Sequence, residues 1–179
     1  MAFSRANLLH SEPLSQLAQT KLPALIDSNL DRSTEVRSTF KSILSLSTFA
    51  AVGVGGVAFA AAFLGAGIFS PNVGVQAVAK TAAPMLFLAV ASTIVSIAVD
   101  GATTASRDWS FMLAFGVTSI FLQTKALARC QTVGGIFATF AARSSAFVLL
   151  AIGRSALGLG NLGKAMRRGD AHIQACVDE

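Results

Sequence analysis

The chain reads SILSLSTFAAVGVGGVAFAAAFLGAGIFSPNVGVQAVA from residue 42 to residue 79, with no charged side chain over this length. An uncharged apolar run of about 18 residues is the usual threshold for a helix that spans a bilayer. This run is long enough for one such helix and a turn, because Ser70-Pro71-Asn72 has the composition of a chain reversal. Shorter uncharged runs follow at 81–99 and 109–124. The sequence therefore predicts several membrane-spanning helices.

The composition supports lipid as the solvent of these helices. Hydrophobic residues make up 53% of the chain and charged residues only 13%, whereas soluble globular domains average about 25% charged residues. The formal net charge is +5. The basic residues lie at the ends of the hydrophobic runs, where Lys and Arg anchor membrane helices. They form no single stripe, and aromatic residues for base stacking are sparse beside them, which argues against a nucleic-acid-binding protein.

The apolar pattern predicts an all-α membrane protein with about four transmembrane helices and an amphipathic N-terminal segment. That segment covers residues 14–25, where apolar residues recur at helical spacing. It is too short and too polar to span, so we expect it in the interface or packed on the bundle. The four predicted spans are 43–69, 78–99, 109–127 and 133–152, and the three parts of the chain are a tail with an amphipathic segment (1–41), a transmembrane domain (42–154) and a polar C-terminal tail (155–179).

Small residues recur at a spacing of four in the first predicted span. In lipid, such pairs let helix backbones approach closely. The alternative, that Gly and Ala are simply common in membrane helices, stays open. The pairs are Ala51 and Gly55, Gly56 and Ala60, and Ala61 and Gly65.

The basic residues near the helix ends predict the orientation. Positive residues accumulate on the cytoplasmic side of membrane proteins. An even number of spans also places both termini on one side, so we expect both termini in the cytoplasm, or in the stroma of a plastid. The larger set is Arg32, Arg37, Lys41, Arg107, Arg154, Lys164, Arg167 and Arg168, against Lys80, Lys125 and Arg129 on the other side.

No constellation of catalytic residues is present in the sequence, which predicts that the chain is not an enzyme. The two cysteines, Cys130 and Cys176, have no metal-site spacing. His10 and His172 lie in polar tails, where surface histidines are the simpler interpretation. The alternative is that they ligate chlorophyll in a photosynthetic membrane. The thirteen Phe residues fit lipid contact and helix packing, or contact with chlorophyll or carotenoid pigments.

Arg143 is the one charged residue inside the fourth predicted span. An unpaired charge at bilayer depth costs about 2.5–3.5 kcal/mol or more. One interpretation is contact with a partner chain, an anionic lipid or a ligand. The other is snorkelling, or pairing with backbone carbonyls and nearby hydroxyls of its own helix: Thr139, Ser144 and Ser145.

Two acidic residues flank the loop between the second and third spans. Asp100 and Gly101 are expected to end a helix, because Gly permits a positive φ and Asp can satisfy local backbone donors. A substrate gate is the alternative interpretation of this pair. Asp108 is expected to cap the helix that begins at Trp109, and Trp109 suits the lipid–water boundary.

The segment VDGATTASRDWSF, residues 99–111, together with GAGIFSPNVGVQAVAKTAAPML, residues 65–86, resembles transporters of the multidrug and toxic compound extrusion (MATE) family, most closely the plastid type. In that family the tenth helix ends in Asp-Gly, and an Asp precedes an aromatic-rich eleventh helix. Asp100, Gly101, Asp108 and Trp109 match this pattern.

The resemblance extends over residues 17–154, with LSQLAQTKLPALI similar to the end of the family's eighth helix and Arg143 in the position of an Arg in the twelfth. It implies a truncated MATE-like C-terminal lobe, about a third of the family's usual length. One lobe and the family's ion-coupling carboxylates have no counterpart here, which implies that the chain alone does not run coupled transport.

The prediction that combines these observations is a non-catalytic accessory subunit of a larger membrane complex, derived from a MATE-like transporter. The resemblance implies a plastid, with a thylakoid photosystem as host. The partners expected are other membrane subunits and lipids. A fragment or half-unit of a proton- or cation-coupled antiporter is the first alternative, and a pigment-binding subunit is the second.

Overall fold

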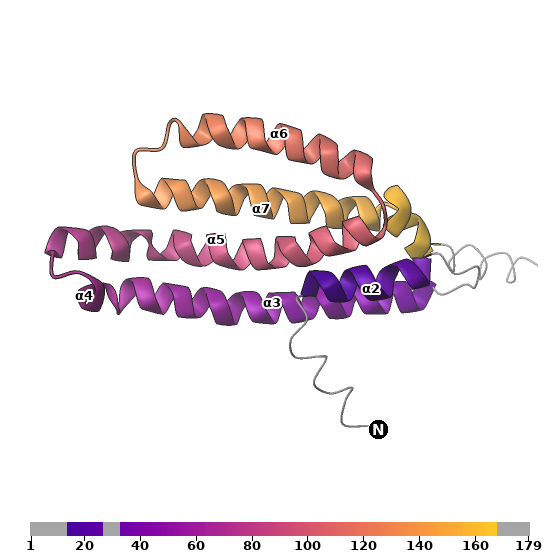
Figure 1. Ribbon diagram of the computed structural model, residues 1–179, viewed down its shortest axis with the longest axis horizontal. Coiled ribbons are helices and arrows are strands. Elements are labelled where there is room, and N and C mark those ends of the chain that lie inside the picture. Colours follow the sequence, from indigo (N-terminus) through magenta and orange to yellow (C-terminus); the bar gives the residue numbers. More distant parts are fainter. Residues whose placement is uncertain (1–13, 27–32, 168–179) are drawn as a thin grey trace, which may run out of the picture. The chain divides into compact units, whose positions relative to one another are not determined.

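The fold comes from a computed structural model, in which residues 14–26 and 33–167 are described, and every regular element in those ranges is a helix (Figure 1). The predicted all-α membrane fold is confirmed, because α3, α5, α6 and α7 are each long and apolar enough to cross a bilayer. Residues 160–167 form one more short helix. The elements are α2 (Leu14–Ile26), α3 (Ser33–Phe63), α4 (Ala66–Phe69), α5 (Val73–Ala105), α6 (Trp109–Leu127) and α7 (Val133–Ala156).

The predicted bounds agree with the structure at α6 and at the turn after α4. The predicted span 43–69 is instead α3, which begins ten residues earlier and ends at Phe63, followed by the short α4. The helix α7 extends four residues beyond the predicted 133–152, and α5 extends beyond the predicted 78–99 at both ends. Asp100 and Gly101 lie inside α5, so the prediction that they end a helix is wrong. A glycine inside a helix costs only about 1 kcal/mol relative to alanine, which does not stop a long apolar helix.

The end of α5 is set by Arg107, which has a φ of +56°. The amide of Arg107 donates to the carbonyl of Thr104, and that of Asp108 donates to Thr103. This is the Schellman arrangement, which closes a helix around one left-handed residue. Glycine usually takes that position, and for this reason the sequence pattern pointed to Gly101 instead of an arginine.

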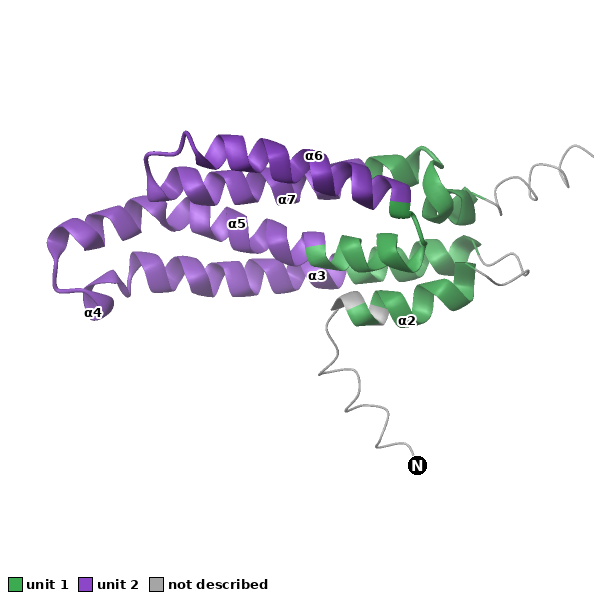
Figure 2. Ribbon diagram, turned by 45° about the horizontal axis from the view of Figure 1, so that its top comes forward, with its two compact units in different colours: residues 1–44, 97–109, 151–179 green, residues 45–96, 110–150 purple. Residues whose placement is uncertain are grey.

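The chain divides into two compact units, each of which takes part of α3, α5 and α7 (Figure 2). Unit 1 consists of residues 1–44, 97–109 and 151–179, and unit 2 consists of residues 45–96 and 110–150. In unit 1, one side of α2 is buried against other helices: Ala18 and Leu22 are fully covered. The rest of this core is Val36, Phe40 and Ile43 of α3, Ala98, Ala102 and Ala105 of α5, and Leu162, Ala165 and Met166 of the short helix.

A turn built on two left-handed glycines returns the chain into the core of unit 1. Gly158 and Gly160 have φ values of +74° and +72°. The amide of Leu159 donates to the carbonyl of Arg154 and that of Gly158 to Ser155, which closes α7. Gly160 also lies directly against the carboxylate of Asp108, leaving no room for a β-carbon.

We therefore predict that Gly160→Ala loosens helix 160–167. The left-handed conformation alone costs an L-residue about 1–2 kcal/mol, and the new methyl group would collide with Asp108. Amide hydrogen exchange across residues 160–167 in detergent should become roughly tenfold faster, since 1.4 kcal/mol is a factor of ten. Gly153→Ala is the matched control, because it lies in α7 with open space around its α-carbon. Equal exchange in both variants would contradict the role of the turn.

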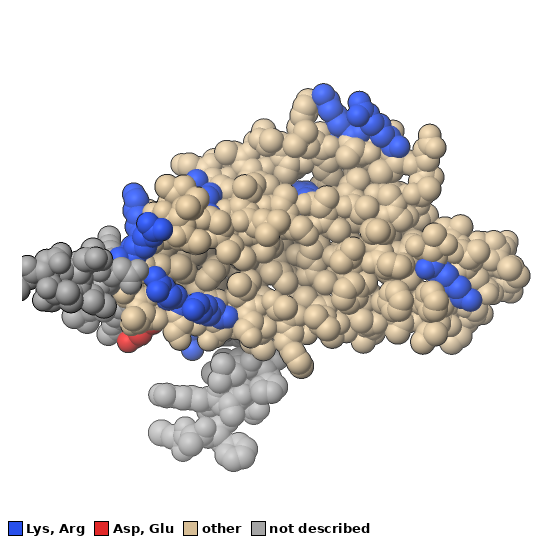
Figure 3. All heavy atoms as spheres, turned by 180° about the vertical axis from the view of Figure 1, so that it is seen from behind, with Lys and Arg blue, Asp and Glu red and all other residues tan. Residues whose placement is uncertain are grey.

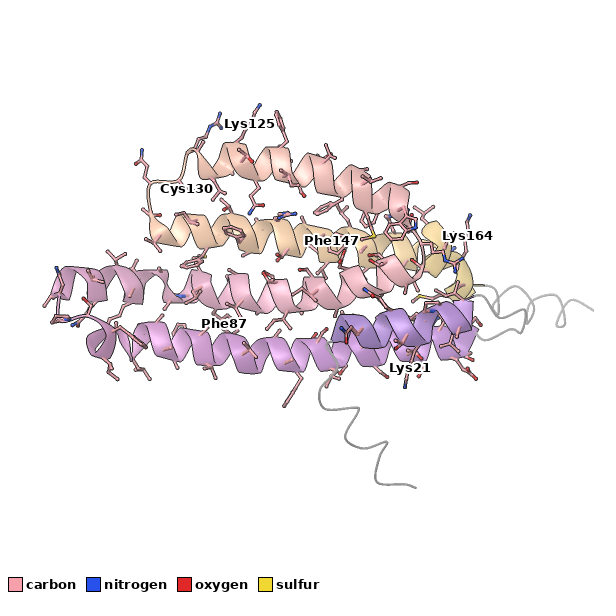
Figure 4. All side chains as sticks on the ribbon, in the orientation of Figure 1. Lys21, Phe87, Lys125, Cys130, Phe147 and Lys164 are labelled. Atoms are coloured by element: carbon pink, nitrogen blue, oxygen red, sulfur yellow. The ribbon has the colours of Figure 1, made fainter. Side chains whose placement is uncertain are left out.

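In unit 2 the helices follow the spatial order α6, α7, α5 and α3 (Figure 1). The hydroxyls of Thr93 and Ser144 meet at 3.4 Å between α5 and α7. Phe87 points from α5 toward α3 (Figure 4), where a β-carbon on Gly55 would come within 3.1 Å of its ring. Ser47 and Ala51, at four-residue intervals before Gly55, are also buried. One of the three predicted small-residue pairs thus forms a helix contact.

The outer surface of unit 2 is too apolar for a protein surface that faces water. Large side chains stand exposed on every helix, such as Phe49 at 81% and Ile68 at 87% of full exposure. Figure 3 shows one face on which most atoms belong to neither basic nor acidic residues. Apolar patches of this extent mark a surface that contacts lipid or other proteins. The chain is accordingly an integral membrane protein.

Replacing Gly55 by Val should weaken the contact between α3 and α5, because the side chain has to displace the Phe87 ring. Overpacking of this kind costs about 1–3 kcal/mol. Gly56→Val is the control, since no atom lies within 4 Å of a β-carbon there. Denaturant-dependent unfolding in mixed micelles measures both changes. A larger loss of stability for Gly56→Val than for Gly55→Val would contradict a close contact between α3 and α5 at Gly55.

Candidate functional site

The candidate site is centred on Arg143, in the middle of α7. Its Nε donates a 3.2 Å hydrogen bond to Oγ of Ser119, and its Nη1 donates a 3.0 Å bond to Oε1 of Gln123. Ser119 and Gln123 are four residues apart on α6, so they lie on the same side of that helix. Two polar positions of α6 thus receive the guanidinium of α7, and these two helices run side by side (Figure 1).

The expected local partners of Arg143 are not the ones observed. Thr139 donates to the carbonyl of Ile136, and Ser144 meets Thr93. The hydroxyl and the amide that hold the guanidinium come from the neighbouring helix instead. A long arginine side chain reaches across a helix pair more easily than it folds back onto its own backbone. The signal that sequence reasoning missed was a hydroxyl and an amide four residues apart on the neighbouring helix, at positions 119 and 123.

One hydrogen-bond donor of this cluster, in the side chain of Gln123, has no acceptor. Arginine only donates, so the oxygen of the Gln123 amide must face it, and this fixes the amide orientation. The amide nitrogen Nε2 is then directed elsewhere, and it is buried without a hydrogen-bond partner. Ser119 in turn donates to the carbonyl of Gly116. A buried donor without an acceptor costs about 1–3 kcal/mol.

The charge of Arg143 has no counter-charge within unit 2. Residues 45–96 and 110–150 contain Lys80, Lys125, Arg129 and Arg143, but no Asp or Glu. Arginine stays protonated under all ordinary conditions. The site therefore carries a permanent positive charge among apolar side chains.

A groove of about 420 Å³ opens beside Arg143, between α6 and α7. Almost all of its accessible surface is apolar. The residues of α6 are Phe115, Thr118, Ser119, Leu122, Gln123 and Ala126, and those of α7 are Thr139, Ala142, Arg143, Ala146 and Leu150. The groove is therefore suited to an apolar occupant, and Arg143 is the one charged residue in its lining.

The other predicted site residues belong to unit 1 and not to this groove. Asp108 directly precedes α6, as expected for a capping residue, and its carboxylate accepts a 3.0 Å bond from Arg154. This pair joins the start of α6 to the end of α7. Trp109 is exposed. The proposed pigment ligands His10 and His172 lie outside the described residues.

Elsewhere in the described ranges 14–26 and 33–167, no cluster of three or more His, Cys, Asp or Glu residues could hold a metal ion. Cys130 has a free thiol, which donates to the carbonyl of Ala126. Comparison with known protein families, with characterised proteins and with solved structures finds no match to this chain. The resemblance to MATE transporters thus stays a prediction.

The uncompensated charge leads to a prediction for Gln123→Glu. A carboxylate at this position would pair with the guanidinium and remove the buried amide donor. The free energy of unfolding of the isolated chain should therefore rise by about 1 kcal/mol. Gln123→Leu is the control, because it removes the same amide without adding charge, and it should lower stability. Unfolding in mixed micelles measures both variants. A Glu variant less stable than the Leu variant would mean that Arg143 is already neutralised.

Proposed function

We propose that this chain is a non-catalytic accessory subunit of a larger membrane assembly, held there by the α6–α7 groove. The occupant we propose is a membrane helix of another subunit that presents a carboxylate to Arg143. The observation that carries the proposal is the guanidinium in an apolar unit without any Asp or Glu. A binding role fits this chemistry, since the groove is apolar around one fixed cation and none of its lining residues is a general base.

The form of the groove supports a helix as the occupant. Its residues recur along α6 from 115 to 126 and along α7 from 139 to 150. At 1.5 Å per residue, each stripe is about 16 Å long, or three helical turns. Ala126, Ala142 and Ala146 lie along it. Small residues on helices in lipid let a partner backbone approach closely, which is where packing between membrane helices gains its energy.

Charge complementarity supports an acidic residue on that helix. A carboxylate near Arg143 would neutralise the charge that Ser119 and Gln123 leave uncompensated. Charged residues inside membranes usually pair with one another. Removing one partner of a buried ion pair destabilises a protein more than replacing both partners by apolar residues, because the remaining charge is then uncompensated.

The host that we propose is a plastid complex, with a thylakoid photosystem as the leading candidate and with both termini in the stroma. The MATE-like sequence pattern supports the plastid. The described basic residues support the orientation, because the larger predicted set falls in unit 1 and the smaller set falls in unit 2. Descent from a transporter would explain a helix-packing surface without a translocation pathway.

Coupled antiport is the weaker alternative, because a proton or cation relay needs an ionisable group that exchanges protons within the membrane. Unit 2 has no carboxylate for this purpose. A pigment-binding subunit stays an alternative on the grounds of its phenylalanines. Direct chlorophyll ligation by this chain would have to use one of its two histidines or a different donor.

We predict that Arg143→Leu releases the chain from its assembly. Affinity purification of the tagged chain from its native membrane, in mild detergent, should recover a membrane partner at fixed stoichiometry. The variant should reduce that recovery at least tenfold, which corresponds to about 1.4 kcal/mol. Quantitative mass spectrometry of the intact complex measures the ratio.

Arg129→Leu is the matched control, because Arg129 lies in the loop after α6 and outside the groove. It should leave the recovery unchanged. Recovery of the partner with Arg143→Leu at the wild-type ratio would refute docking at this groove. A wild-type chain that is isolated alone and drives proton-dependent efflux in liposomes would favour the antiporter.

A further inference from the structure

Unit 1 holds a second pocket, of about 410 Å³, which the proposed docking site does not use. Three basic residues surround it: Arg37 and Lys41 of α3, and Arg167 of helix 160–167. No Asp or Glu is among the described residues that line it. Arg37 and Lys41 are four residues apart on α3, where like charges repel each other. A bound anion would relieve that repulsion.

The floor of this pocket is apolar. It includes Phe40 and Met166, which are buried in the core of unit 1, and Leu44 and Ile152, which lead from the basic residues toward the apolar parts of α3 and α7. An inorganic ion would gain nothing from these side chains. An amphiphile with an anionic head and an acyl chain would use both parts of the pocket.

Backbone carbonyls hold the two guanidinium groups in position. Nη2 of Arg167 donates a 2.8 Å bond to the carbonyl of Ala156, the last residue of α7. Nη2 of Arg37 donates a 3.3 Å bond to the carbonyl of Met166. Cations at the carboxyl end of a helix are stabilised by its dipole. Because an arginine has five N–H donors, Arg167 can hold this carbonyl and still donate to an oxyanion.

The pocket lies where lipid phosphates would be. Lys41 is the last charged residue before the uncharged run of 42–79. Ile152 comes just before Arg154, at which the apolar run of α7 ends. The apolar stretches of two helices therefore begin and end at the lining of the same pocket, which is the depth at which lipid head groups meet hydrocarbon.

We propose that this pocket is a binding site for an anionic membrane lipid, with the lipid phosphate between Lys41 and Arg167 and an acyl chain along Leu44 and Ile152. Basic pockets between membrane helices at the positively charged side of a membrane are suited to such head groups. The site is separate from the α6–α7 groove, so it stands whether or not the docking proposal does.

Native mass spectrometry of the delipidated chain, after addition of phosphatidylglycerol or phosphatidylcholine, tests this site. The chain should retain phosphatidylglycerol at least tenfold better than the zwitterionic lipid. Unfolding in detergent with added inorganic phosphate tests a free anion, and should show no stabilisation at concentrations where phosphatidylglycerol stabilises. Equal retention of both lipids, or equal stabilisation by inorganic phosphate, would overturn the proposal.

The double variant Lys41→Gln/Arg167→Gln should lose the preference for phosphatidylglycerol by a factor of ten or more. Lys164→Gln is the matched control, because Lys164 is an exposed cation on the same short helix but does not line this pocket. The variant Lys41→Arg/Arg167→Lys keeps both charges and should keep the preference, so a loss caused by misfolding is recognised. A preference that survives in the Gln variant would refute the site.

Discussion

The positive charge of Arg143 is the constraint on which the account of this chain depends. It lies on an apolar helix, in a unit whose other charged residues are all basic. Ser119 and Gln123 supply dipoles for it but no counter-charge. Hydrocarbon cannot solvate the remaining charge. A membrane helix with such a residue is therefore more stable when another molecule supplies an anion, and this is the physical reason for proposing a partner with a carboxylate.

The two units differ in the kinds of side chain that they contain and expose. Unit 2 packs α3 on α5 through small residues around Gly55 and leaves large apolar side chains outward. Unit 1 collects the amphipathic helix α2, the short helix 160–167 and most of the ionisable groups. Its ion pair between Asp108 and Arg154 and its two left-handed glycines fix the helix ends. The apolar unit thus presents a surface to lipid or to other proteins, and the more polar unit has the ionisable groups expected at the membrane–water interface.

The sequence was sufficient for the helices that hydrophobicity alone determines. The absence of charge from 42–79 and the Trp109–Leu127 run gave the spans, and α6 was predicted residue for residue. It was not sufficient where a helix end depends on backbone geometry. Asp100-Gly101 has the composition of a terminus, yet the left-handed residue is Arg107. Helix 160–167 lies in a segment that looked like a polar tail, because its apolar residues are few and are buried only by contacts distant in sequence.

Arg143 was identified from sequence because a charge within an apolar run is conspicuous, but its partners were not. Ser119 and Gln123 are more than twenty residues away, and only the packing of α6 on α7 brings them together. The most direct test of the central claim is photocrosslinking in the native membrane from position 146, which lines the groove. The account predicts a crosslink to a membrane-spanning peptide that contains Asp or Glu. Crosslinks to lipid alone would contradict it.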